Sequence, residues 1–112
     1  MNFDKKIKKL YEALDQRIVI IDGAMGSTLQ RYKLQEEDYR GTVFKEHSIL
    51  LKNNNDVLNI TQPHLIEEVS REFLEAGADI IETNTFNANA VSQEKFELQS
   101  QVVEINLSLI HI

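Results

Sequence analysis

Residues 17–27, Arg-Ile-Val-Ile-Ile-Asp-Gly-Ala-Met-Gly-Ser, hold the pattern on which the predicted fold depends. The first five of these residues form a short run that is mostly β-branched and has no alternating polar positions. Such a run is typical of a parallel strand buried on both faces. Gly23 and Gly26 then interrupt the run, and glycine favours turns. The stretch therefore predicts a buried strand at 17–21 followed by a turn.

The same pattern recurs twice further along the chain. Residues 57–60 and 78–83 predict a second and a third strand, and apolar residues at helical spacing predict helices over 3–15 and 63–76. Gly77 is expected to end the second of these helices, because glycine adopts the left-handed backbone of a helix C-terminus. Strands that alternate with helices are joined in parallel by right-handed crossovers.

The predicted fold class is therefore α/β, with about three βα units. A complete (β/α)8 TIM barrel takes about 250 residues, whereas this chain has 112. Two architectures remain open at this point. The chain is either a small three-stranded α/β domain or the N-terminal part of a TIM barrel.

Composition excludes several classes of protein. No apolar run approaches the ~20 residues of a membrane span, and no secretory signal is recognisable, so the expected location is cytoplasmic. The net charge of -6 argues against a nucleic-acid partner. The one basic cluster, within residues 5–9, is interpreted as the solvated face of a helix rather than as a nucleic-acid patch. The chain has no cysteine and three histidines without metal-ligand spacing, so neither a metal site nor a catalytic residue is predicted.

Ligands of parallel α/β folds gather at the carboxyl ends of the strands. The positions selected by this rule follow the three predicted strands: Asp22, Gly23 and Ala24 after the first, Asn59 and Thr61 after the second, and Glu82, Thr83, Asn84, Thr85, Asn87 and Asn89 at the third. Asp22 suits an ammonium group, and exposed backbone N–H groups near Gly23 suit a carboxylate. The two sites together would hold an amino-acid zwitterion. The alternatives are an N-cap or an Asx turn at Asp22, turn geometry at Gly23 and Gly26, and satisfied loop amides at Asn84 and Thr85.

Four segments carry a resemblance to known proteins: IVIIDGAMGS at 18–27, EEDYRG at 36–41, NNDVLNITQP at 54–63 and REFLEAGADIIETNTFNANAVSQ at 71–93. They resemble the N-terminal homocysteine-binding domain of the cobalamin-dependent methionine synthases, in the homocysteine S-methyltransferase family. The resemblance covers about residues 10–106, in the same order and spacing.

The resemblance implies a fold and an activity. The fold would be the N-terminal part of a (β/α)8 barrel, and the partner would be homocysteine, whose thiol is activated by zinc. Methylcobalamin would donate the methyl group to give methionine. Methyltetrahydrofolate, bound on another module, would then remethylate the cobalamin. The homocysteine contacts of the family fall on Asp22, Gly23 and Ala24, and at the third strand on Glu82, Asn84 and Thr85.

The chain also departs from the family pattern. The zinc-binding cysteines and the folate and cobalamin modules of the parent chain are absent, and residues 107–112 are an atypical tail. Ser27 stands where threonine is expected, and Asn53 stands where glycine is expected. Residues 1–112 are therefore expected to be a partial homocysteine-binding domain that binds no cofactor and is inactive alone. Two alternatives stay open: a methyltransferase that uses betaine or S-methylmethionine or is fused to a folate reductase, and a non-catalytic α/β fragment.

Overall fold

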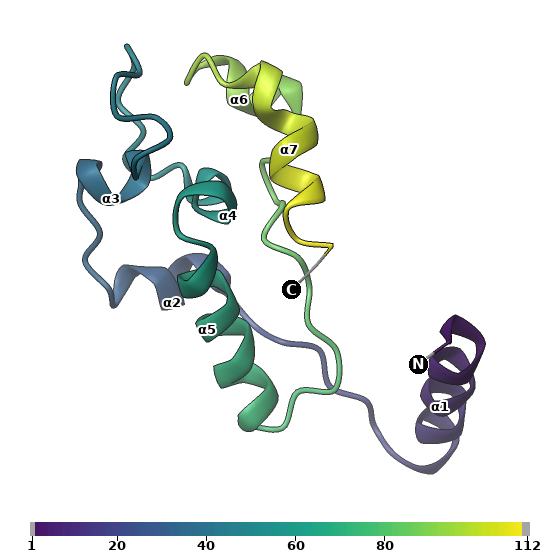
Figure 1. Ribbon diagram of the computed structural model, residues 1–112. Coiled ribbons are helices and arrows are strands. Elements are labelled where there is room, and N and C mark those ends of the chain that lie inside the picture. Colours follow the sequence, from purple (N-terminus) through teal and green to yellow (C-terminus); the bar gives the residue numbers. More distant parts are fainter. Residues whose placement is uncertain (1, 111–112) are drawn as a thin grey trace.

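The computed structural model describes residues 2–110, which are mainly helical (Figure 1). The elements in chain order are α1 (Phe3–Gln16), α2 (Met25–Gln30), α3 (Glu36–Arg40), the 3-10 helix η1 (Asn55–Val57), α4 (Leu58–Thr61), α5 (Pro63–Glu75), α6 (Ala90–Glu94), the 3-10 helix η2 (Gln99–Gln101) and α7 (Val102–Leu107). Extended segments join α1 to α2 and α5 to α6.

The predicted fold class is wrong for this chain, because residues 2–110 form no sheet and no βα units of a TIM barrel. The β-structure in this range is one isolated parallel bridge between Ile21 and Ile80. Backbone bonds from Asp79 N to Ile20 O, at 2.8 Å, and from Asp22 N to Ile80 O, at 2.9 Å, flank this bridge. The first and third predicted strands are therefore extended segments that pair at a single point.

The second predicted strand, 57–60, is helical instead and falls in η1 and α4. The Asn54 side chain caps the turn by accepting a hydrogen bond from Val57 N. Pro63 disfavours helical backbone in the residue before it, and Gln62 accordingly has φ -135° and ψ 56° between α4 and α5. A parallel strand needs hydrogen-bonding neighbours along its length, and a capped helical turn satisfies the same backbone groups locally.

Two of the predicted helices are confirmed. Helix α1 matches the expected 3–15, and Asn2 caps it by accepting a hydrogen bond from Asp4 N at 2.6 Å. Helix α5 matches the expected 63–76, and Gly77 follows it with φ +112°. Within the described range no helix combines the length and the hydropathy that a bilayer crossing requires.

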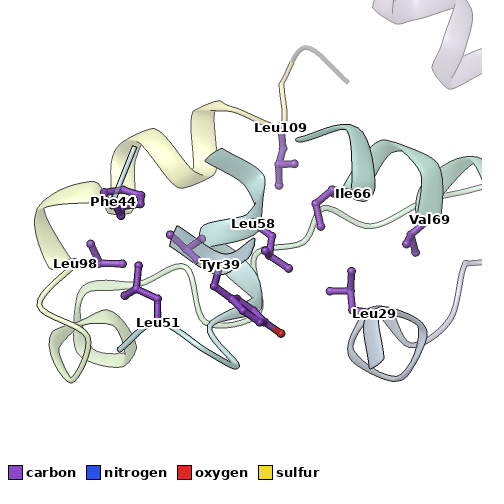
Figure 2. Close-up of a cluster of buried hydrophobic side chains, with 10 residues drawn as sticks. Leu29, Tyr39, Phe44, Leu51, Leu58, Ile66, Val69, Leu98 and Leu109 are labelled. Atoms are coloured by element: carbon purple, nitrogen blue, oxygen red, sulfur yellow. The ribbon is translucent and has the colours of Figure 1, made fainter. Parts of the chain in front are cut away.

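Helix α1 lies apart from the remaining helices (Figure 1). None of its residues is buried, and its apolar side chains Phe3, Tyr11 and Leu14 are more than half exposed. Segments between residues 25 and 109 pack around one apolar core. Its buried members are Leu29, Tyr39, Phe44, Leu51, Val57, Leu58, Ile66, Val69, Leu98 and Leu109 (Figure 2). Since these residues come from segments throughout 29–109, the core holds α2 to α7 together.

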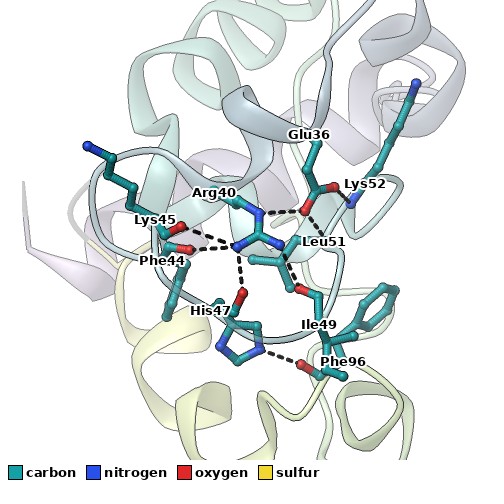
Figure 3. Close-up of polar contacts among 9 residues, drawn as sticks. All are labelled: Glu36, Arg40, Phe44, Lys45, His47, Ile49, Leu51, Lys52 and Phe96. Atoms are coloured by element: carbon teal, nitrogen blue, oxygen red, sulfur yellow. Dashed lines mark hydrogen bonds and ion pairs between the residues drawn. The ribbon is translucent and has the colours of Figure 1, made fainter.

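The loop after α3 is held by a single arginine (Figure 3). Arg40 pairs with Glu36 at 2.7 Å and donates to four backbone carbonyls between Phe44 and Ile49, the shortest being that of His47 at 2.6 Å. Glu36 also accepts the N–H groups of Leu51 and Lys52. Burial raises the pKa of Glu36, but these hydrogen bonds and Arg40 outweigh that effect and lower it. The pair therefore organises the chain that leads into η1.

Candidate functional site

The two bridged segments and the turn that contains η1 enclose a cavity of about 330 Å³. Residues 22–26 line it on one side and residues 82–87 on another, and Asn53, Asn55 and Asp56 complete the wall. The charged residues of this wall are Asp22, Asp56 and Glu82, with no lysine, arginine or histidine among them. The cavity is therefore polar and anionic, which suits a small ligand that carries a positive charge.

Asp22 lies where the bridge opens into the cavity. Its backbone N–H donates to Ile80 O, and its Oδ2 accepts the backbone N–H of Glu82 at 3.1 Å, 60 positions along the chain. One carboxylate oxygen therefore joins the two walls. The other carboxylate oxygen accepts no hydrogen bond from another residue in 2–110. A carboxylate with a free oxygen can accept a charge-assisted hydrogen bond from a ligand.

An ion pair next to the bridge holds the two segments together. Both terminal nitrogens of Arg17 donate to the carboxylate of Asp79, at 2.8 and 2.7 Å, and Ile20 N donates to Asp79 Oδ2 at 3.0 Å. The Arg17 side chain lowers the pKa of Asp79 from 3.8 to about 2, with the Ile20 hydrogen bond adding to the effect. Asp79 in turn raises the pKa of Arg17. This pair lies outside the cavity and fixes the register of the bridge beside it.

Gly23 and Ala24 contribute backbone to the wall. Neither residue's amide donates a hydrogen bond to another residue in 2–110, so both N–H groups remain available to a ligand. Gly23 also has a packing role, since a Cβ at this position would lie 3.1 Å from the Phe73 ring of α5. The glycine is therefore explained in part by a close approach to α5, and not by ligand access alone.

Asn84 is buried and bonded within the fold. Its side-chain nitrogen donates to Asn55 O and to Asn59 Oδ1, both at 2.8 Å, and Asn59 Nδ2 donates to Asn84 O at 2.7 Å. Both N–H groups of the Asn84 side chain therefore have acceptors within the fold. This agrees with the alternative interpretation of Asn84 as a satisfied loop amide. Thr85 Oγ1 lies 2.8 Å from Thr83 Oγ1, and Glu82 is exposed at the cavity edge. The six predicted site residues all line one cavity. The side-chain N–H groups of Asn84, however, bond to Asn55 and Asn59 and hold the fold together.

Sequence reasoning missed the wall formed by Asn53 and the start of η1. Asn53, Asn55 and Asp56 were not among the candidate site residues. Asp56 is 3% exposed and lies in the middle of η1. The sequence did contain a signal. Asp56 comes directly before the apolar residues Val57 and Leu58, and an aspartate is rarely buried together with such neighbours. Asn53 has φ +74°, as expected for an asparagine in the place of a glycine.

A zinc site does not fit this part of the protein. The sequence has no cysteine, and no group of three or more histidine, aspartate or glutamate side chains in residues 2–110 converges so that it could hold a metal ion. Asp22, Asp56 and Glu82 share the cavity without forming such a group. The arrangement therefore supports binding of an organic cation or zwitterion and supplies no Lewis acid.

These features define a small polar binding site built from two bridged segments and a capped turn. The sequence matches the model of the homocysteine S-methyltransferase family over residues 19–112, most of the chain. The chain belongs to this family of methyltransferases. The matched region contains all of the cavity and omits α1, the helix that lies apart from the core.

Proposed function

We propose that this chain binds the amino-acid end of homocysteine in the cavity, as part of a methionine synthase of the cobalamin-dependent type. One observation carries the proposal. Residues 22–24 and 82–85 come together around one anionic cavity in a chain of the homocysteine S-methyltransferase family. The cavity volume of about 330 Å³ is in the range of small-molecule sites.

The roles of the binding residues follow from their chemistry. Asp22 accepts a hydrogen bond from the ammonium group through the oxygen that Glu82 N does not engage. The amides of Gly23 and Ala24 donate to the carboxylate, since neither has an acceptor within residues 2–110. Thr85 offers a hydroxyl at the edge. Homocysteine presents an ammonium and a carboxylate at one end, which matches this pairing of an acceptor with two donors.

The proposed cofactors are zinc and methylcobalamin, and both belong to the parent protein rather than to this chain. Methylcobalamin is the proposed source of the methyl group, and methyltetrahydrofolate is the proposed donor that remethylates the cobalamin. The residues described here do not fit a zinc ion, so the thiol would have to be activated by groups outside residues 2–110. The contribution of this chain is to bind and orient the amino-acid end of the substrate.

A non-catalytic role is the second candidate. It is favoured by two features of residues 2–110: they contain no metal-holding group, and they do not form the sheet that the resemblance implied. Betaine and S-methylmethionine remain alternative methyl donors for the parent enzyme. Methionine formation by the full gene product with methylcobalamin, betaine or S-methylmethionine supplied separately distinguishes the three donors.

The binding proposal is tested on Asp22. L-homocysteine is titrated into the chain by calorimetry, with the wild type and Asp22→Asn. The amide that this substitution introduces keeps an acceptor for Glu82 N and removes the charge. A hydrogen bond to a charged group is worth about 1.5–3 kcal/mol, so affinity should fall about ten- to a hundredfold.

Asp15→Asn, in α1 and away from the cavity, is the matched control and should bind homocysteine as the wild type does. Unchanged affinity in Asp22→Asn, together with lower resistance to urea, would assign Asp22 a purely structural role through its bond to Glu82. No binding by the wild type would reject the cavity as a homocysteine site.

A further inference from the structure

Asp56 is a buried carboxylate for which the fold provides no counter-ion. It lies in η1, is 3% exposed and lines the cavity. Its Oδ2 accepts the backbone N–H of Asn87 at 3.0 Å. No lysine, arginine or histidine in residues 2–110 forms an ion pair or hydrogen bond with it. Charged side chains are rarely buried to this degree without a partner.

The contacts of Asp56 do not require a charge. Burial raises its pKa, and the hydrogen bonds from Asn87 N and from its own backbone N–H oppose the rise only in part. An asparagine would accept the same bond from Asn87 through its Oδ1 without the cost of desolvating an ion. The fold therefore explains a polar side chain at position 56 but not a carboxylate.

The Asp56 carboxylate has no second partner among the other residues of the described range. Oδ2 accepts the N–H of Asn87, and Oδ1 accepts no hydrogen bond from another residue in 2–110. The other donor to the carboxylate is the backbone N–H of Asp56 itself. Asp56 lines the same cavity as Asp22, whose own free oxygen is described above. Two carboxylates from different segments thus border one space that contains no cationic side chain.

We propose that Asp56 is a second anionic contact for the ammonium group of the amino-acid ligand, in addition to Asp22, and that it selects ligands carrying this group. The inference rests on the proposed function and adds a residue that determines specificity. An ammonium group has three N–H donors, so it can donate hydrogen bonds to both carboxylates and to one further acceptor. A metal ion is the less favoured cation, since no group in the described chain could hold one.

The test compares two ligands that differ only in the ammonium group. L-homocysteine and 4-mercaptobutyrate, which lacks the amine, are titrated into the wild type, Asp56→Asn and the control Asp15→Asn. The wild type and the control should prefer homocysteine by tenfold or more. Asp56→Asn should lose about tenfold in homocysteine affinity and keep its affinity for 4-mercaptobutyrate. Its urea midpoint at pH 7 should be equal or higher, because a desolvated charge has been removed.

A structural role gives a different result. If Asp56 only positions Asn87, the variant should lose affinity for both ligands alike or for neither, and either result overturns the inference. Should Asp56→Asn fail to fold, the wild type still provides the test. The carboxyl ¹³C resonance of Asp56 should move on addition of homocysteine and stay in place with 4-mercaptobutyrate. A resonance that responds equally to both ligands would overturn the inference.

The outcomes separate this inference from the proposed function. A wild type that binds homocysteine in an Asp22-dependent way, while Asp56→Asn binds it equally well, contradicts the inference alone. A wild type that binds neither ligand contradicts the proposed function, and the inference falls with it.

Discussion

Asp79 illustrates how a single side chain brings the cavity walls together. Its carboxylate accepts hydrogen bonds from both terminal nitrogens of Arg17 and from Ile20 N. These contacts lie next to the only bridge between the two extended segments in residues 2–110. Exposed ion pairs contribute little on average, but this pair is bidentate and is reinforced by a backbone donor. Its effect should therefore be local, on the bridge and the cavity beside it.

The first prediction concerns the pH dependence of this bridge. The pKa of Asp79 is about 2 in the folded chain, against an ordinary value of 3.8. Because the folded pKa is the lower one, ionised Asp79 favours the folded state. The stabilisation should be complete above about pH 4 and should disappear as the pH falls through about 2. A ¹³C NMR titration of the Asp79 carboxyl, followed together with the Ile20 amide, measures this directly.

Two variants test whether Arg17 is the cause of the lowered pKa of Asp79. Arg17→Gln should return the Asp79 titration towards 3.8, whereas Arg71→Gln, which removes the arginine of a different ion pair, should leave it in place. An Asp79 carboxyl that titrates at the same pH with and without Arg17 would contradict the assignment.

At the scale of elements, α3 and its following loop depend on one arginine. Arg40 has a side-chain exposure of 17% and satisfies four backbone carbonyls between Phe44 and Ile49 as well as Glu36. A guanidinium can bond several acceptors at once because its donors form a planar fork, whereas a lysine ammonium is a compact point charge. The loop conformation should therefore need arginine and not merely a positive charge.

Arg40→Lys should lower the free energy of unfolding by about 2–3 kcal/mol, since hydrogen bonds to a charged group are lost and carbonyls are left without donors. Urea unfolding measures the loss, and amide exchange should become faster at Leu51 and Lys52, which bond to Glu36. Arg71→Lys changes an exposed pair and should cost less than about 1 kcal/mol. Equal losses in the two variants would show that Arg40 acts only as a charge.

At the scale of the whole molecule, the described chain leaves much apolar surface uncovered. Phe86 is 93% exposed, Ile18 is 85% exposed and Val91 is 83% exposed, while α1 buries nothing. One apolar core joins α2 to α7, but the two bridged segments have no further strands beside them in residues 2–110. The cavity lies beside these two segments, and no residues of the described range form a group that could hold a metal ion.

The last prediction follows from that arrangement. A zinc site requires three or four ligands that converge from several elements, and none converge in the described residues. Calorimetric titration of the chain with zinc should show no stoichiometric binding tighter than about micromolar. Tight 1:1 binding that is lost in His47→Gln or His64→Gln would contradict the prediction and place a metal site on this chain.

Several features of the molecule could be predicted from the sequence because they depend on local contacts. Helices α1 and α5, the end of α5 at Gly77 and the left-handed backbone of Asn53 were all predictable. A helix forms its hydrogen bonds within four residues, so its pattern is present in any short stretch. The grouping of Asp22–Ala24 with Glu82–Thr85 was also predictable, since both follow apolar segments that meet at the bridge.

Only the tertiary structure decided the remainder. The run at 57–60 has the composition of a strand, but a ladder needs distant partners, and the cap from Asn54 and the restriction imposed by Pro63 favour a helical turn. The same dependence on distant groups applies to Asp56. Its burial and its lack of a counter-ion depend on Asn87 and on the residues that surround the cavity. Local contacts determined helices α1 and α5, whereas long-range packing determined which extended segments pair and which carboxylates line the cavity.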